Sequence, residues 1–325
     1  MGAGGRAGKA CPERRPAKLG RGRTTCPELV EGDPGGECAR ALPHGSRAGA
    51  QENHGGSIDY AVAVDELDPV VVGWRPGLRR VAVIIPARFG AQRFPGKPLA
   101  DLAGKPVIAH TVERARRARG VDVVAVATDD ERIAAAATRA GAEAILTGPA
   151  ATGTDRVAEA ARKLQPRPTL VVNVQGDEAL IEPEAIETLI RAMDESGADM
   201  GTLMRPIDPG EVDLPQVGKV VTDLQGHALY FSRSPIPFRR AGGISPRMRA
   251  TVGIYGYTAE FLERFAALAP GRLEQEESLE QLRALEHGFK IQVAETTYRG
   301  FGIDTPEDLE RARAFLAAGP RHESG

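Results

Sequence analysis

The sequence predicts an α/β fold: a doubly wound, mostly parallel sheet with an antiparallel or mixed extension. From residue 80 onward, short apolar runs rich in β-branched residues alternate with helical segments, and such alternation is typical of parallel strands covered by helices on both faces. Later strand-like runs follow one another without long helices between them. That second pattern predicts the antiparallel or mixed extension.

The first half of this region supplies four strands and four helices. Val81 begins an apolar run without alternation, as expected for a strand buried on both faces. Pro86 has no amide hydrogen to donate, so we expect the hydrogen-bonding ladder to end there. The predicted strands are 81–86, 121–127, 142–146 and 169–174, and the predicted helices are 106–118, 130–140, 154–164 and 183–195.

The second half begins with the run of strands and closes with helices. Within a predicted helix at 276–287, Leu279, Leu282 and Leu285 recur at helical spacing and form an apolar face. Glu280 and Gln281 lie off that face, where they could reach a polyhydroxylated ligand. The predicted strands are 200–206, 218–223, 227–231, 251–257 and 290–295, and the remaining helices are 259–267 and 306–317.

The chain divides by composition into three parts. Residues 1–79 are dominated by Gly, Pro, Arg and Ala, a composition that buries too little surface to offset the entropy of ordering. We therefore expect a disordered N-terminal extension at 1–79, one folded domain at 80–318 and a flexible tail at 319–325.

Charge and cysteine content narrow the possible functions. A net charge of −2 over 325 residues gives no general affinity for nucleic acid or anionic membranes. No apolar run approaches the roughly 20 residues that span a bilayer, so we expect no membrane insertion. All three cysteines lie in the first forty residues, which favours a cytoplasmic protein whose chemistry uses carboxylates, basic groups or an oxygen-bound metal.

A basic loop follows the first strand. Arg88, Arg93 and Lys97 lie within ten residues beside Gly90 and Gly96, and such cations at a strand end favour a bound triphosphate. The spacing matches neither a P-loop nor a dinucleotide fingerprint. The alternative is an ordinary solvated loop, because basic residues are common in turns.

Two aspartates are candidate metal ligands. Asp177 follows a hydrophobic strand directly, and Asp304 follows another apolar segment. A Mg²⁺ site needs only one or two carboxylates together with phosphate oxygens and water. The alternative for each is a helix cap: Asp177 lies early for the helix at Pro183, whereas Asp304 opens the capping-type sequence DTPED.

Other polar residues stand where ligands bind in parallel sheets, beyond the carboxyl ends of the strands. Thr128 and Asp129 end one predicted strand, and Gln175 ends another. Arg156, in the first turn of a predicted helix, could clamp a carboxylate or form a surface ion pair.

Eight segments together resemble the 3-deoxy-manno-octulosonate cytidylyltransferase family, collinearly over 81–317. This resemblance implies a Rossmann-like sheet of nucleotidyltransferase type and transfer of CMP from CTP to the anomeric hydroxyl of 3-deoxy-manno-octulosonate (Kdo), with release of pyrophosphate. It also implies a Mg²⁺-dependent homodimer that serves lipopolysaccharide biosynthesis. The segments are PARFGAQRFPGKPLADLAGKPVIAHTVERA, VATDDERI, GTDRVAEA, VNVQGDEALI, ALYFSRSPIPF, VGIYGY, LEQLRALEHG and GIDTPEDLERAR.

The resemblance also assigns residues to roles. Asp177 and Asp304 match the family's metal ligands, and Arg88, Lys97 and Asp177 are the expected catalytic residues. The expected nucleotide-binding residues are Pro86, Ala87, Arg88, Lys97, Thr128, Asp129 and Gln175. The expected sugar-binding residues are Arg156, Arg240, Thr251, Tyr255, Glu280 and Gln281, with Arg156 and Arg240 facing the sugar carboxylate.

The chain departs from the family pattern at three positions. Thr251 stands where the family has a sugar-binding histidine, Ala179 replaces a proline, and Gly218 precedes Lys219. The Thr251 change leaves open another acidic sugar, either a modified Kdo or a nonulosonate. A further alternative, from a different class, is a nucleotide-binding module without catalysis.

Overall fold

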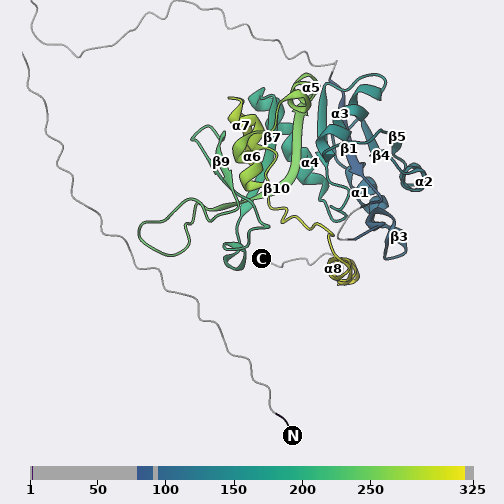
Figure 1. The fold of residues 1–325 in the computed structure, drawn as a ribbon. Helices are drawn as coiled ribbons and strands as arrows, with labels where there is room; N and C mark the ends of the chain where they lie inside the picture. Colours follow the sequence, from purple (N-terminus) through teal and green to yellow (C-terminus); the bar gives the residue numbers. More distant parts are fainter. Residues whose placement is uncertain (1, 3–78, 91–93, 319–325) are drawn as a thin grey trace, which may run out of the picture. The chain divides into compact units, whose positions relative to one another are not determined.

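The computed structural model describes residues 2, 79–90 and 94–318 (Figure 1). The expected extension at 1–79 lies almost entirely outside these residues, as does the tail at 319–325. Within the described part, no helix is both long enough and apolar enough to cross a bilayer.

The helices and strands follow the predicted order closely. The strands are β1 Val81–Ala87, β2 Asp101–Leu102, β3 Lys105–Pro106, β4 Val123–Thr128, β5 Glu143–Leu146, β6 Leu170–Val174, β7 Met200–Pro206, β8 Lys219–Thr222, β9 Ala228–Ser232, β10 Arg249–Thr258 and β11 Ile291–Glu295. The α-helices are α1 Val107–Ala115, α2 Glu131–Arg139, α3 Gly153–Lys163, α4 Pro183–Ser196, α5 Ala259–Ala267, α6 Arg272–Glu277, α7 Leu282–Glu286 and α8 Pro306–Ala318.

The main sheet is mixed, as predicted. Its strand order is β11-β7-β10-β6-β1-β4-β5, and β8 pairs with β10 and β9. The pairs β6–β1, β1–β4, β4–β5 and β11–β7 are parallel, whereas β10 is antiparallel to both β6 and β7. The chain winds outward from β1 through β4 to β5 and then returns to the other side of β1 with β6. That reversal makes a topological switch point, where open α/β sheets bind ligands beyond the strand ends.

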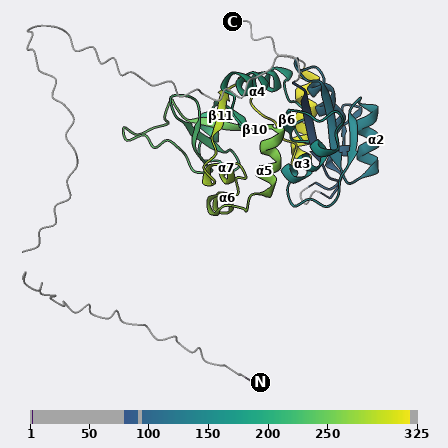
Figure 2. The same ribbon diagram turned by 90° about the horizontal axis from the view of Figure 1, so that it is seen from above.

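Helices cover both faces of the sheet (Figure 2). The alternating side chains of β1 separate the two cores: Val83 and Ile85 pack with α1, α2 and α4, while Ala82 and Ile84 pack with α3 and α5. A third, smaller cluster joins residues 179–180 to the segment 301–312, including Ile303 and Leu309. This cluster brings the last helix beside the end of β6.

Two predictions about elements are wrong. The helix expected at 276–287 is two helices, α6 and α7, because Ser278 has φ +50° and ends the first of them. The ladder does not stop at Pro86: pairing with β4 continues through Ala87, while pairing with β6 ends at Ile84. The backbone amide position of Pro86 faces β6, whose pairing with β1 has already ended at Ile84. The missing amide hydrogen of Pro86 therefore costs no ladder hydrogen bond.

Candidate functional site

A pocket of about 510 Å³ lies at the switch point between β1 and β6. It is large enough for a nucleotide, and four separate parts of the chain supply its walls. We call it the first pocket. Its lining residues are Pro86, Ala87, Arg88, Phe94, Lys97, Pro98, Ala150, Ala151, Thr152, Gly153, Arg156, Gln175, Gly176, Asp177 and Asp304.

The floor of the first pocket depends on a close approach between two strand ends. A Cβ atom at Gly176 would lie 2.8 Å from the carbonyl oxygen of Pro86, which is too close for any side chain. The absence of a side chain therefore lets the segment after β6 lie against the end of β1. This contact brings Asp177 opposite the basic loop.

Lys97 joins the two aspartates. Its ammonium Nζ lies 2.7 Å from Oδ2 of Asp177 and 3.1 Å from Oδ1 of Asp304, although the two acids are 127 positions apart in the chain. The side chain of Lys97 is only 12% exposed, so water screens these contacts weakly. The predicted convergence of both carboxylates opposite the basic loop is therefore present.

Neither aspartate serves as a helix cap. The residue before α4 is Glu182, which leaves Asp177 outside that helix. At α8, Thr305 Oγ1 accepts a hydrogen bond from the amide of Asp308, and the Asp308 carboxylate accepts one from the amide of Thr305. This is a capping box, and it leaves the Asp304 carboxylate turned toward Lys97.

The two carboxylates fit a hard divalent cation. They already converge on one positive group, and carboxylate oxygens together with substrate phosphates are the ligands that Mg²⁺ prefers. The described residues contain no cluster of three or more acidic, histidine or cysteine ligands. Any metal held here would therefore complete its coordination with oxygens from a ligand or water.

The other residues predicted to bind the nucleotide separate into two groups. Pro86, Ala87, Arg88 and Gln175 line the first pocket. Thr128 is fully buried and accepts a hydrogen bond from the amide of Asp130. It does not reach the pocket.

Arg156 lines the first pocket, although the prediction places it with the sugar. Its Nη2 donates to Oδ2 of Asp129 at 2.7 Å, and its Nη1 donates to the hydroxyl of Thr147. The guanidinium is buried, so the surface-pair alternative does not describe it. Asp129 does not line the pocket, but it holds the side chain of Arg156, which does.

A second pocket of about 430 Å³ opens on the antiparallel side of the sheet. Three of the predicted sugar-binding residues line it: Thr251, Tyr255 and Gln281. Gln281 is buried, and its Nε2 has no hydrogen-bond partner among the described residues. An unsatisfied buried amide facing a cavity favours a polar ligand there.

Arg233 also lines the second pocket, and the sequence analysis did not identify it. Its guanidinium donates to three backbone carbonyls, those of Glu277, Pro215 and Ser278. These contacts fix the side chain, and none of them is to a carboxylate. The Glu277 carboxylate accepts a hydrogen bond from the backbone amide of Arg233 rather than from its guanidinium, so the guanidinium can present a charged donor to an anionic ligand.

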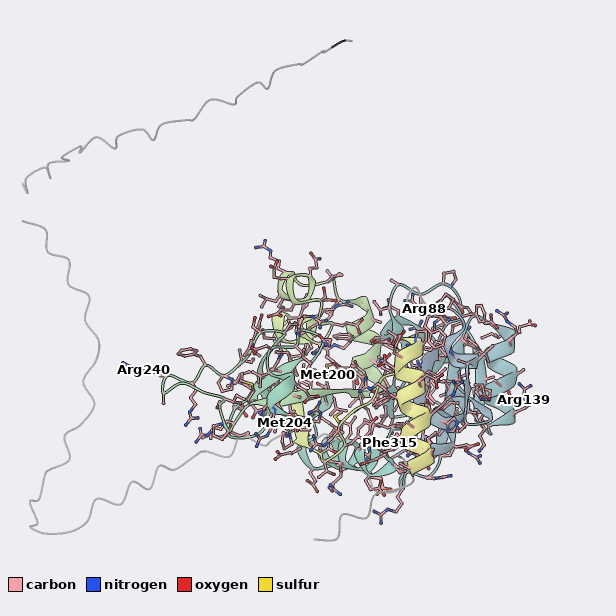
Figure 3. The ribbon with its side chains drawn as sticks, turned by 90° about the horizontal axis from the view of Figure 1, so that it is seen from below. Arg88, Arg139, Met200, Met204, Arg240 and Phe315 are labelled. Carbon is pink, nitrogen blue, oxygen red and sulfur yellow. The ribbon has the colours of Figure 1, made fainter. Side chains whose placement is uncertain are left out.

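Two predicted sugar-binding residues line neither pocket. Arg240 is exposed on the long loop between β9 and β10, and Figure 3 shows it at the opposite side of the molecule from Arg88. Oε2 of Glu280 accepts a hydrogen bond from Thr154, and its Oε1 has no hydrogen-bond partner in the described part of the chain but lies 3.8 Å from Nη2 of Arg283.

Glu178 is a second pocket residue that was not predicted from the sequence. It follows Asp177 directly but lines the second pocket rather than the first. Burial raises the pKa of its carboxyl, and the charges of Asp177 and Asp304 act in the same direction. Hydrogen bonds from the hydroxyl of Tyr298 and the amide of Phe301 oppose that rise.

Comparison with known proteins identifies the chain's relatives. The family model described as cytidylyltransferase matches residues 82–291. A 3-deoxy-manno-octulosonate cytidylyltransferase from Anaeromyxobacter sp. (strain Fw109-5) is 77% identical over 244 residues, covering 75% of this chain and 100% of the relative. An 8-amino-3,8-dideoxy-manno-octulosonate cytidylyltransferase from Shewanella sp. (strain W3-18-1) is 48% identical over 244 residues, covering 74% and 99%.

A solved structure gives the same assignment. A CMP:2-keto-3-deoxy-manno-octonic acid synthetase in complex with CTP matches with a TM-score of 0.70 and 41% sequence identity, covering 74% of this chain and 99% of that chain. The predicted fold class is thereby confirmed. The chain belongs to the cytidylyltransferases and, within them, to the 3-deoxy-manno-octulosonate cytidylyltransferase family.

Proposed function

We propose that this protein transfers CMP from CTP to the anomeric hydroxyl of Kdo and releases pyrophosphate. The observation that carries the proposal is the first pocket, in which Lys97 faces Asp177 and Asp304 at the switch point of the sheet. The 77% identity to a relative named for this reaction supports the same conclusion.

In this proposal the first pocket holds CTP. The triphosphate lies along the basic loop, where Arg88 and Lys97 neutralise its negative charge. Gln175 and the segment 150–153 contact the nucleoside, and Arg156 is held in place by Asp129. When the triphosphate enters, the Lys97 ammonium exchanges a carboxylate contact for phosphate oxygens.

The second pocket holds the acidic sugar. Arg233 is the cation best placed for the sugar carboxylate, in the role that the sequence analysis gave to Arg240. The amide of Gln281 and the hydroxyls of Tyr255 and Thr251 are suited to the sugar hydroxyls. Burial raises the pKa of Tyr255, so this side chain is a neutral hydrogen-bonding group at neutral pH.

The reaction is an in-line displacement at the α-phosphorus. The anomeric oxygen forms a bond to phosphorus, the bond from phosphorus to the bridging oxygen of the β-phosphate breaks, and the hydroxyl proton is released. No covalent enzyme intermediate is needed, so the residues act by orientation and charge neutralisation. Lys97 and Arg88 stabilise the charge that develops on the departing pyrophosphate.

Asp177 and Asp304 would hold Mg²⁺, and a second ion brought in with the triphosphate would make a two-metal arrangement. When bound, the metal would neutralise phosphate charge and favour ionisation of the attacking hydroxyl. We also propose that the protein is a cytoplasmic homodimer in lipopolysaccharide biosynthesis, as the family resemblance implies.

The test is release of pyrophosphate from CTP and Mg²⁺ with a panel of acidic sugars. Kdo is expected to give the highest kcat/KM. The panel also includes 8-amino-3,8-dideoxy-manno-octulosonate and a nonulosonate, because Thr251 departs from the family pattern. One relative is named for the 8-amino sugar. Preference for either would assign another sugar. Binding of CTP without turnover of any sugar would instead identify a nucleotide-binding module.

A further inference from the structure

The segment between β11 and α8 borders both pockets. Residues 299–302 line the second pocket, and Asp304 lines the first. The segment has no regular secondary structure, so its course depends on the contacts that attach it to the rest of the protein. Those contacts decide where the Asp304 carboxylate points.

One carboxylate oxygen makes two of these attachments. Oε2 of Glu178 accepts a hydrogen bond from the hydroxyl of Tyr298 at 2.5 Å and another from the backbone amide of Phe301 at 3.2 Å. Tyr298 is 4% exposed and packs within the larger core. A buried acceptor that two donors share fixes both of them, because each would be left without a partner if it moved away.

A third attachment comes from the neighbouring residue. The amide of Ile303 donates to the carbonyl oxygen of Asp177 at 3.1 Å, and the Ile303 side chain is fully buried. The two consecutive residues Asp177 and Glu178 therefore hold the segment on both sides of Gly302. Asp304 directly follows Ile303, so the same contacts determine its position.

We infer that the hydrogen bond between Glu178 and Tyr298 is a latch that sets the distance between Asp177 and Asp304, so that Glu178 and Tyr298 are positioning residues for the divalent cation. The inference rests on the proposed function. Neither residue touches the metal or the reacting atoms. Residues that orient metal ligands in this way change metal affinity by about 10- to 100-fold when they are removed.

Tyr298→Phe isolates the latch, because it removes only the hydroxyl and keeps the ring in the core. The measured quantity is the ratio of CTP affinity with Mg²⁺ to CTP affinity without it, obtained by calorimetry. This ratio cancels contacts that do not involve the metal. We expect Tyr298→Phe to lower the ratio by about tenfold, with the metal-free affinity for CTP unchanged.

Two variants of Glu178 extend the test. The amide oxygen of Glu178→Gln still accepts both hydrogen bonds, so this variant is expected to keep the ratio within about threefold of the wild type. Glu178→Ala removes both hydrogen bonds and is expected to lower the ratio at least as much as Tyr298→Phe. Adding Tyr298→Phe to Glu178→Ala is expected to cause little further loss, because the hydroxyl then has no acceptor left to lose.

The controls separate the latch from general damage and from the proposed function. Tyr230→Phe removes a tyrosine–glutamate contact, Tyr230 Oη to Glu277, away from the aspartates and is expected to leave the ratio unchanged. Asp177→Asn defines the ratio without a metal site. A wild-type ratio of one would contradict the proposed metal site itself.

The latch alone is overturned if the wild type shows a large ratio and Tyr298→Phe or Glu178→Ala retains it. It is also overturned if Glu178→Gln loses as much as Glu178→Ala, because charge rather than hydrogen bonding would then be responsible. Should Tyr298→Phe fail to fold, the contrast between the two Glu178 variants decides the question.

Discussion

The two pockets are built in different ways. The first pocket is built mainly from the ends of parallel strands β1 and β6 and the segments that follow them, and residues 150–156 and Asp304 complete it. The second pocket collects residues from β10, the loops around β8 and β9, the turn between α6 and α7, and the segment after β11. The first is a local consequence of strand order, whereas the second depends on how distant segments pack.

This difference predicts which substitutions affect which substrate. Changes in the first pocket should alter CTP binding and the chemical step. Changes in the second pocket, apart from those at Glu178, should alter the KM of the sugar alone, because uniform loss of ground-state and transition-state binding raises KM and leaves kcat unchanged.

The largest effect is expected from Asp177→Asn. The amide keeps the shape of the side chain but removes the charge that faces Lys97 and would hold the metal. Turnover should fall by about 10³-fold or more, as when a dominant electrostatic contribution to the transition state is removed. The measurement is the rate of pyrophosphate release. Asp199→Asn, at an exposed site outside both pockets, is the matched control, and near-normal turnover of Asp177→Asn would refute the assignment.

Lys97→Ala should have the next largest effect, about 10²-fold in kcat/KM for CTP. It removes the ammonium that neutralises the triphosphate and leaves Asp177 and Asp304 repelling each other. Steady-state kinetics at varied CTP should show a higher KM and a lower kcat. Lys105→Ala, which breaks only an exposed pair with Glu113, should change neither. An effect of Lys97→Ala confined to the KM of the sugar would contradict the division between the pockets.

Arg233→Ala tests the second pocket. Loss of the charge facing the sugar carboxylate should raise the KM of the sugar by about 10- to 100-fold, which corresponds to the 1.5–3 kcal/mol of a charged hydrogen bond, with the KM of CTP unchanged. Arg240→Ala is the companion variant, since Arg240 lines neither pocket. We expect it to change the sugar KM less than about threefold; the reverse ranking of the two arginines would restore the original prediction.

The difference between the two pockets explains which site residues could be predicted from the sequence and which could not. The convergence of Lys97 and Asp177 follows from parallel topology, because the carboxyl ends of parallel strands share one edge of the sheet. Asp304 joins them through the contacts of the irregular segment that follows β11. Arg233 was missed because it reaches the second pocket only through the pairing of β8 with β9 and its contacts with Glu277 and Ser278. Nothing local distinguishes Arg233 from Arg240.

The incorrect prediction of one helix at 276–287 has another cause, a backbone conformation that packing imposes. The run from 276 to 287 has helical periodicity, but Ser278 adopts φ +50°, a conformation that its own sequence does not favour. Arg233 donates to the carbonyl of Ser278 from across the pocket. A long-range contact of this kind overrides local propensity. The break in the helix leaves Gln281 in the lining of the second pocket and Glu280 outside it.

The smallest expected effect concerns stability around the second pocket. Glu211 lines that pocket. The Arg205 guanidinium donates one hydrogen bond to each oxygen of the Glu211 carboxylate, and this lowers the pKa of Glu211 below the ordinary value of 4.5. The folded protein therefore binds this proton less tightly than the unfolded chain does. The stabilisation is fully present above pH 4.5 and is lost as the pH falls through the lowered pKa.

Glu211→Gln should accordingly lower the free energy of unfolding by about 1 kcal/mol at pH 7. The difference from the wild type should shrink as the pH falls below 4.5, because the protonated wild-type carboxyl then resembles the amide. Urea unfolding at several pH values measures this. A difference that persists undiminished at low pH would mean that Glu211 acts by packing rather than by its charge on Arg205, and the second pocket would then depend on shape more than on ion pairing.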